Sequence, residues 1–122
     1  MRFVNPLPFV ADMDRSRRFY TQVLGLEIVE DHGDFVRFDN GFAIHEGASL
    51  LRSVFGRTSK PTEPFGRDNL VLYFEVEDLD ATFADIGKKV DLIHPVQMQG
   101  WGQRVFRFHD PDRHIIEIGE PQ

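Results

Sequence analysis

The side chain with the clearest chemical potential is Glu117, which lies in an apolar run near the end of the chain. The run reads His-Ile-Ile-Glu-Ile over residues 114–118, and the alternation of a β-strand turns Glu117 to the face opposite Ile116 and Ile118. Because an ionised carboxylate is costly to bury in a dry core, we expect that face to line a polar cavity. A carboxylate in such a place can act as a general base or bind a metal ion.

Three other side chains are candidate ligand contacts. Alternation along residues 70–76 puts Tyr73 on the face that we expect to line the cavity, although a strand Tyr also serves ordinary packing. Trp101 lies between two glycines, where it can cap a pocket, stack on a planar ligand or cover the core. Arg104, with Arg107 close by, can attract an anionic ligand or lie on a solvated strand face.

Composition limits the available chemistry. The chain has no cysteine, which excludes disulfides, thiolate metal sites and cysteine nucleophiles, so any metal ion must be held by His and carboxylate. A net charge of −6 and scattered basic residues disfavour nucleic acid as a partner. No apolar stretch approaches the ~20 residues that span a bilayer. No export signal is seen at the N-terminus, so we predict a soluble, cytoplasmic protein without a membrane partner.

The elements that must position these side chains occur twice in the sequence. The phrase Val-Ala-Asp-Met-Asp at residues 10–14 matches Val-Glu-Asp-Leu-Asp at residues 76–80, which lies 66 positions later (76 minus 10). Each phrase ends an apolar run and begins a predicted helix, with Asp12 or Asp78 as the N-cap. The repeat predicts two copies of one structural unit.

Three strand-like segments follow each predicted helix, separated by turn signals. They cover residues 26–30, 35–38 and 42–45 in the first half and residues 90–93, 105–108 and 115–118 in the second. The sequence thus predicts an α+β fold in which the order βαβββ occurs twice. We expect one domain over residues 1–122, made of a unit at 1–46, a connector at 47–68 with a helical turn at 50–55, and a unit at 69–122. The two units should form a half-open, barrel-like sheet with a central cleft and the helices outside.

Three phrases also occur in a recognisable order along nearly the whole chain. They are the helix start at residues 9–14, Phe-Tyr followed by Leu-Gly-Leu within residues 19–26, and Asp-Pro-Asp-Arg-His-Ile-Ile-Glu at residues 110–117. The chain thereby resembles the vicinal oxygen chelate superfamily of glyoxalases, extradiol dioxygenases, and bleomycin- and fosfomycin-resistance proteins. Because that superfamily includes several kinds of enzyme as well as binding proteins, the resemblance implies a fold and a small-molecule ligand rather than one activity.

The resemblance implies one divalent metal ion in the cleft (Zn, Ni, Mn, Co or Fe) and no organic cofactor. The four positions that match the family's ligands, on the first and last strands of each unit, are Asn5, His45, Val71 and Glu117. His45 is matched to Glu117 by lining up residues 41–45 with residues 113–117. Val71 has no donor atom and Asn5 offers only a weak carbonyl oxygen, so the predicted metal ligands are His45 and Glu117.

Two functions fit this pattern. The first is a divalent-metal-dependent lyase or isomerase with an incomplete metal site, in which Glu117 and His45 are catalytic as metal ligands or as a base whose imidazole the carboxylate orients. An oxygenase is disfavoured because redox iron needs a third ligand. The alternative is a metal-free protein that sequesters a cationic small molecule in an acidic cleft with aromatic walls, contacted by Asn5, Tyr73, Trp101 and Arg104.

His45 also has a simpler interpretation, as a partly exposed His at a strand end that is hydrogen-bonded to Glu46 or to the backbone. The resemblance further implies a homodimer, and exposed sheet edges make such pairing physically reasonable. The expected partners are therefore a small-molecule ligand and a second copy of the chain, with the cleft formed either within one chain or across the dimer.

Overall fold

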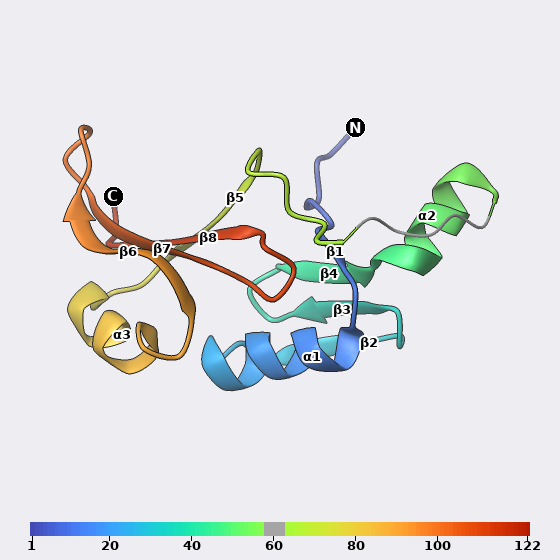
Figure 1. Ribbon diagram of the computed structural model, residues 1–122, viewed down its shortest axis with the longest axis horizontal. Helices are drawn as coiled ribbons and strands as arrows, with labels where there is room; N and C mark the ends of the chain where they lie inside the picture. Colours follow the sequence, from blue (N-terminus) through green and yellow to red (C-terminus); the bar gives the residue numbers. More distant parts are fainter. Residues whose placement is uncertain (58–62) are drawn as a thin grey trace. The chain divides into compact units, whose positions relative to one another are not determined.

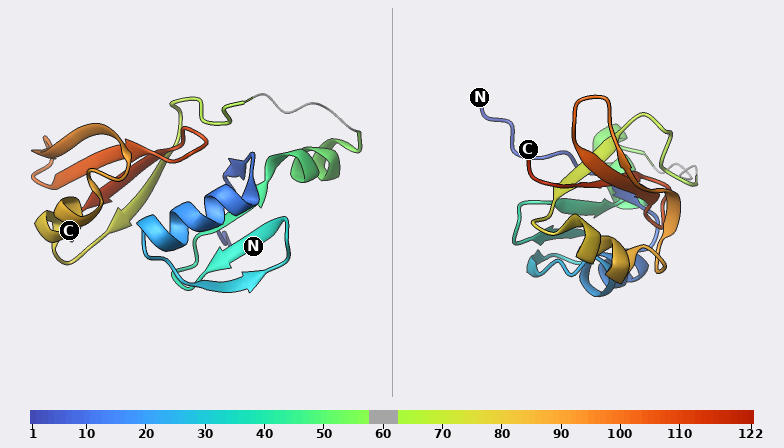
Figure 2. Two further views of the ribbon diagram at one scale, coloured as in Figure 1. Left: turned by 60° about the horizontal axis from the view of Figure 1, so that its bottom comes forward. Right: turned by 90° about the vertical axis from the view of Figure 1, so that its left-hand side faces the viewer.

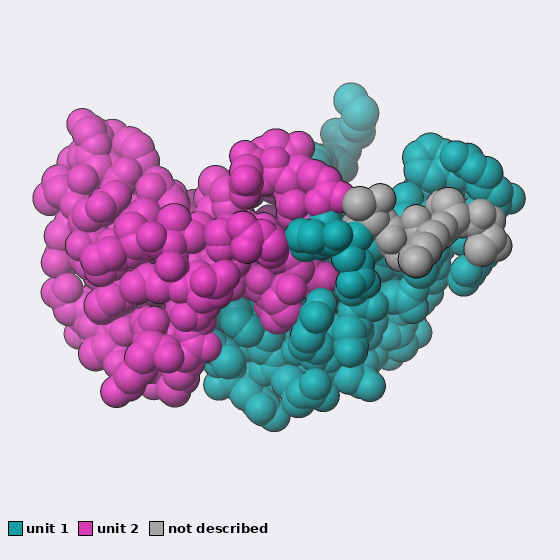
Figure 3. All heavy atoms as spheres, in the orientation of Figure 1, with its two compact units in different colours: residues 1–65 teal, residues 66–122 magenta. Residues whose placement is uncertain are grey.

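The computed structural model describes residues 1–57 and 63–122, and residues 58–62 of the predicted connector lie outside the described part. The chain divides into two compact units, Met1–Phe65 and Gly66–Gln122, which Figure 3 distinguishes by colour. Each unit is described by itself. Among the described residues, no helix has the length and apolar character needed to cross a membrane.

The first unit is a four-stranded sheet with a helix across one face (Figures 1 and 2). Its elements are β1 (Phe9–Val10), α1 (Met13–Arg18), a π-helical turn (Phe19–Val23), β2 (Ile28–Asp31), β3 (Phe35–Phe38), β4 (Ala43–Glu46) and α2 (Gly47–Phe55). The strand order is β1-β4-β3-β2, with β1 parallel to β4 and the other pairs antiparallel. Tyr20 packs on Phe38 in the buried core between helix and sheet, with ring centroids 5.9 Å apart.

The second unit repeats this topology. Its elements are β5 (Val71–Glu75), α3 (Leu79–Ile86), β6 (Asp91–Met98), β7 (Arg104–His109) and β8 (Ile115–Gly119). The strand order is β5-β8-β7-β6, with β5 parallel to β8. Phe83 of α3 packs edge-on against buried Phe106 of β7, with centroids 5.1 Å apart. The predicted α+β fold with two βαβββ units is confirmed, and in the part of the chain that the structure describes neither sheet closes on itself.

The repeated Asp residues begin the helices as the sequence predicts. The Asp12 carboxylate accepts a hydrogen bond from the Arg15 backbone N–H at 3.0 Å, and Asp78 accepts one from Ala81 N–H at 3.0 Å. Each Asp has an extended backbone and satisfies one of the N–H groups that a helix leaves unpaired in its first turn. The hydrogen bond from Arg15 also lowers the pKa of Asp12.

The connector contains more regular structure than the predicted turn at residues 50–55. Helix α2 begins at Gly47 because the Glu46 carboxylate accepts from Ser49 N–H at 2.9 Å, and it ends at Gly56, whose φ is +69°. The chain returns to the first unit at Phe65, which packs on Phe9 with ring centroids 5.7 Å apart. The compact first unit thus includes α2 and extends to Phe65.

Candidate functional site

Four polar side chains form a row across the sheet of the second unit. Strand β5 pairs with β8 at Tyr73 and Glu117, β8 pairs with β7 at Glu117 and Arg107, and β7 pairs with β6 at Arg107 and His94. Residues directly opposite one another on paired strands project from the same face of a sheet. Each strand therefore contributes one polar side chain to a single line on one face.

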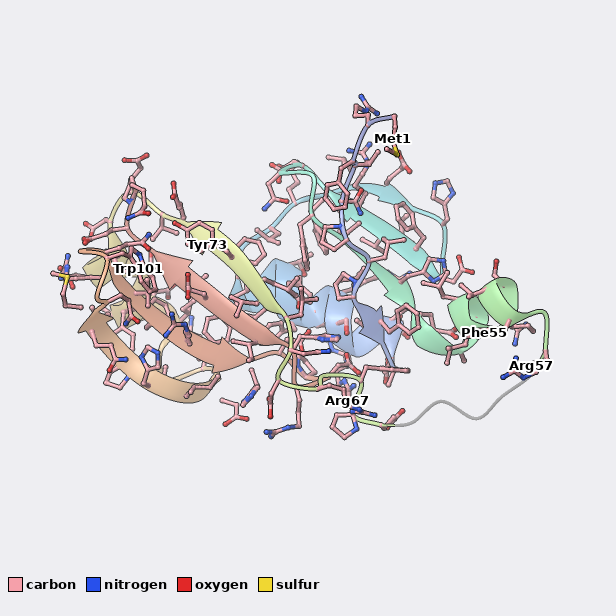
Figure 4. All side chains as sticks on the ribbon, turned by 90° about the horizontal axis from the view of Figure 1, so that it is seen from above. Met1, Phe55, Arg57, Arg67, Tyr73 and Trp101 are labelled. Carbon is pink, nitrogen blue, oxygen red and sulfur yellow. The ribbon has the colours of Figure 1, made fainter. Side chains whose placement is uncertain are left out.

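The opposite face of the same sheet is the core of the unit. Ile116 and Ile118 flank Glu117 along β8 and are both buried on the side of α3 together with Phe106. This alternation confirms that Glu117 points away from Ile116 and Ile118, as the sequence predicts. Figure 4 looks down on the side of the sheet away from α3 and labels Tyr73 and Trp101.

Glu117 is 8% exposed, and its charge is balanced by Arg107 rather than by water alone. Arg107 Nε donates to Glu117 Oε1 at 2.7 Å, and Arg107 Nη2 lies 2.6 Å from the same oxygen. Burying a carboxylate is tolerable when a hydrogen-bonded cation accompanies it. The pair is thus a two-point contact that gives Glu117 a fixed position in the row.

Arg107 also orders the imidazole next to it. Arg107 Nη1 lies 3.1 Å from His94 Nε2, and His94 Nδ1 lies 2.8 Å from the carbonyl oxygen of Pro95. A guanidinium only donates and a carbonyl only accepts, so the proton of the imidazole is on Nδ1 and Nε2 is the acceptor. Arg107 therefore donates in both directions along the row, to His94 Nε2 on one side and to the Glu117 carboxylate on the other.

Two exposed aromatic rings lie at the β5 side of the sheet and in the turn between β6 and β7. Tyr73 is 45% exposed and Trp101 is 56% exposed. The Tyr73 hydroxyl donates to Glu75 Oε2 at 2.5 Å and accepts from Gln103 Nε2 at 2.7 Å. Partial burial raises the pKa of Tyr73, and the hydrogen bond to Glu75 raises it further. The phenol is therefore held neutral beside a carboxylate.

The structure places Arg104 differently from Arg107. Arg104 shares the alternation of Phe106, and its guanidinium contacts Glu120 Oε2 at 3.1 Å and Asp80 at the start of α3 at 3.2 Å. It lies on the α3 side of the sheet, whereas Arg107 lies beside Glu117. Of the two arginines that the sequence considered, it is Arg107 that joins the row.

Two of the sequence candidates, His45 and Asn5, belong to the first unit. His45 pairs with Phe9 and Phe35 on the neighbouring strands, and its Nδ1 lies 3.0 Å from the Glu46 carbonyl oxygen. That contact matches the simpler interpretation, a strand-end His bonded to the backbone of Glu46. Asn5 precedes β1, and its amide donates to the Pro6 carbonyl at 2.8 Å.

Strand register gives Glu117 a different counterpart from the one that sequence alignment suggests. In the first unit Arg37 pairs with Ala43, whereas in the second Arg107 pairs with Glu117. The loop between paired residues is longer by four in the second unit, since 117 minus 107 is 10 and 43 minus 37 is 6. By strand register, the residue of the first unit that corresponds to Glu117 is therefore Ala43, and His45 lies two residues further along β4.

The donors in each unit do not fit a metal centre of the kind that the resemblance implies. Among the described residues, no three or more His, Asp or Glu side chains form a group that can hold a metal ion. The neighbours of Glu117 across the strands are Tyr73 and Arg107, and Arg107 occupies one of its carboxylate oxygens. Val71, at the matching position on β5, has no donor atom.

Arg107, Gln103 and His94 complete the site. The sequence suggests Arg107 only as a neighbour of Arg104 that can attract an anionic ligand, and it does not single out Gln103 or His94. Arg107 lies between buried Phe106 and Phe108 in β7, and only pairing with β8 places it against Glu117. Gln103 is a polar residue that the turn buries, and its partner Tyr73 lies 30 positions earlier. A clue for Gln103 is Gly119, since a glycine inside a strand often marks the close approach of another group.

Comparisons with known proteins agree with this architecture. A sequence family described as a glyoxalase-like domain matches residues 3–122. The uncharacterized protein YraH of Bacillus subtilis (strain 168) is 34% identical over 115 residues, which are 89% of this chain and 90% of that protein. A crystal structure of a protein of unknown function from Agrobacterium tumefaciens str. C58 is 57% identical, with a TM-score of 0.94 over 100% of this chain and 95% of that chain.

A more distant structure shares the fold alone. A fosfomycin resistance protein from Listeria monocytogenes is 19% identical, with a TM-score of 0.69 over 100% of this chain and 94% of that chain. The doubled βαβββ topology defines a class of two-unit α+β proteins. Within that class, the chain belongs to the glyoxalase-like family of the vicinal oxygen chelate superfamily.

Proposed function

We propose that this protein binds a small, planar, cationic molecule without a metal ion, using the polar face of the second sheet. The observation that carries the proposal is the exposed ring of Tyr73 beside Glu75, with the exposed ring of Trp101 joined to it through Gln103. Aromatic faces attract cations, and a nearby carboxylate adds direct charge complementarity.

Charge at this place favours a cation over an anion. Within the part of the chain that the structure describes, no cation pairs with Glu75, whose contact is the Tyr73 hydroxyl. Arg107 is the nearest guanidinium along the row, and Glu117 neutralises it. The net charge of −6 for the whole chain adds a weaker attraction of the same sign.

The competing proposal is a metal-dependent lyase or isomerase with His45 and Glu117 as ligands. It leaves Glu117 only Oε2 for a metal ion, because Oε1 already accepts from Arg107, and Val71 at the matching position of β5 has no donor atom. This small set of donors supports the metal-free function. The central cleft, the homodimer and the cytoplasmic location stay predictions of the sequence.

A pair of probes of matched shape tests the proposed function. We expect 9-aminoacridine, a planar cation, to bind at slightly alkaline pH, as followed by fluorescence polarisation, and neutral acridine to bind at least about tenfold more weakly, since one charge contact supplies about that factor. Glu75→Gln should remove the preference for the cation, whereas Glu77→Gln, at an exposed carboxylate beyond the end of β5, should keep it.

Metal analysis separates the two functions. Elemental analysis of purified, untagged protein should show no stoichiometric metal, and Zn, Ni, Mn, Co and Fe(II) should leave the melting temperature unchanged. A near-stoichiometric metal whose stabilising effect disappears in Glu117→Gln, together with no binding of 9-aminoacridine, would establish the metal-dependent function instead.

A further inference from the structure

Gln103 lies in the turn just before β7 and is only 3% exposed, although its side chain is fully polar. Its amide makes three hydrogen bonds. Trp101 Nε1 donates to Gln103 Oε1 at 2.8 Å, and Gln103 Nε2 donates to the Tyr73 hydroxyl at 2.7 Å and to the Glu120 carbonyl at 2.7 Å. A primary amide has two N–H donors and one carbonyl, so both donors and the carbonyl of Gln103 are in use.

These partners fix which way the amide faces. A rotation that exchanged its oxygen and nitrogen would set the amide carbonyl against the Glu120 carbonyl and the amide N–H against the Trp101 N–H. Both contacts would be repulsive, so a single orientation satisfies every group. The Tyr73 hydroxyl accepts from Gln103 and so directs its own proton to Glu75. One directed chain thus runs from Trp101 to Glu75.

Gly119 makes room for this arrangement. A Cβ added there would lie 2.6 Å from Gln103 Nε2 and 3.2 Å from a ring atom of Tyr73. Gly119 belongs to strand β8, opposite Glu75 on one side and Val105 on the other. Glycine weakens a strand interior, so its presence is explained by the side chain that passes over it.

We infer that Gln103, seated over Gly119, is a positioning residue that holds Trp101 and Tyr73 as a preformed surface for a planar ligand. This inference rests on the proposed function. Gln103 raises the affinity of that site by ordering the two rings, and it makes no charge contact with the ligand. Side chains ordered before binding lose less conformational freedom when the ligand arrives. Gln103 therefore contributes to affinity through the two rings, and Glu75 contributes through charge.

The sole tryptophan of the chain makes a direct readout, because fluorescence excited at the red edge of tryptophan absorption, where tyrosine does not absorb, reports Trp101 alone. Gln103→Leu has a side chain of similar size and removes all three hydrogen bonds. Gly119→Ala keeps Gln103 but displaces its amide, because the added Cβ takes the space that the amide occupies. In both variants we expect lower fluorescence anisotropy and easier acrylamide quenching of Trp101. Affinity for 9-aminoacridine should fall about 5- to 20-fold, the effect of losing one or two positioning hydrogen bonds.

Matched variants isolate the positioning role. Gln97→Leu makes the same replacement at an exposed position of β6 and should leave both readouts as in the wild type. Glu75→Gln should weaken 9-aminoacridine binding without changing the anisotropy of Trp101. Gln103→Met has a similar length and no amide, so it serves if Gln103→Leu does not fold, and it should also bind more weakly.

The two proposals fail in different ways. If the wild type binds no 9-aminoacridine but Gln103→Leu mobilises Trp101, the proposed function fails and the positioning of the rings stands. If the wild type binds the probe and folded Gln103→Leu or Gln103→Met binds it equally well, the positioning role is overturned. Unchanged anisotropy of Trp101 in both folded Gln103 variants overturns it as well.

Discussion

At the scale of single residues, the ion pair between Glu117 and Arg107 allows the second sheet to bury a carboxylate. The carboxylate is nearly buried and the guanidinium largely so, which makes their contact more than a surface ion pair. Neither residue stands alone, because Arg107 also donates to His94. Removing one member therefore leaves the other with an unmet charge rather than returning it to water.

We predict that Glu117→Gln lowers the free energy of unfolding by about 1–3 kcal/mol, because it leaves the Arg107 guanidinium without its anion. Urea denaturation of the two proteins measures the difference. Glu77→Gln removes an exposed carboxylate and should change stability by less than ~0.5 kcal/mol. Adding Arg107→Met to Glu117→Gln should recover part of the loss, and equal stability of Glu117→Gln and wild type would contradict the prediction.

Tyr73 gives the site an alkaline pH dependence. Its pKa is raised above the usual 10.0, first by partial burial and then by the hydrogen bond to Glu75. A group whose folded pKa is raised contributes stability that is fully present below its unfolded pKa of about 10 and is lost as the pH rises through the folded value.

We expect wild type to lose more stability than Tyr73→Phe above pH ~10, because only the wild type must ionise this phenol. The difference in phenolate absorbance between the two proteins during an alkaline titration should show a midpoint above 10.0. Glu75→Gln should lower that midpoint, since it removes a negative charge that opposes ionisation. A midpoint at or below the usual value would show that Tyr73 is not held as described.

At the scale of elements, α3 depends on one side chain at its start. Asp78 accepts from Ala81 N–H at 3.0 Å, and no other cap of that kind serves this helix among the described residues. We predict that Asp78→Ala lowers the free energy of unfolding by ~1 kcal/mol. Asp78→Ser keeps a capping oxygen and should lose only a few tenths of this stability, as measured by thermal unfolding. Equal loss in the two variants would assign the effect to something other than capping.

The elements also show what sequence can and cannot predict in this fold. The two helix starts are local signals, since an Asp and the next three residues contain all the groups involved, and both were predicted correctly. The register of β4 is not local, because it depends on the length of the preceding turn. Ala43, not His45, therefore faces Arg37 in the way that Glu117 faces Arg107. Likewise, the partners of Gln103 come from residues 73 and 120 and become neighbours only in the folded sheet.

At the scale of the whole molecule, both sheets end in open edges. Among the described residues, strands β1 and β5 each have one hydrogen-bonded neighbour, and exposed Leu70 and Val71 lie at the β5 edge. Open edges favour association because their unpaired backbone groups can bind another strand. We predict a homodimer with twice the 14.1 kDa mass of the chain, measured by sedimentation at several concentrations. A monomer at every concentration would contradict this prediction.

The parallel pairing between the first and last strands of each unit also affects the order in which the strands can pair during folding. Strand β5 has β8 as its neighbour, so residues 71–75 gain a hydrogen-bonded partner only when residues 115–119 have been synthesised. In the first unit the corresponding separation in sequence is shorter, from β1 at residue 9 to β4 at residue 46. Such long-range pairings slow folding because a loop must close before any contact is gained. On the ribosome, the surface that carries Tyr73 and Glu75 therefore takes shape only after β8 has been synthesised.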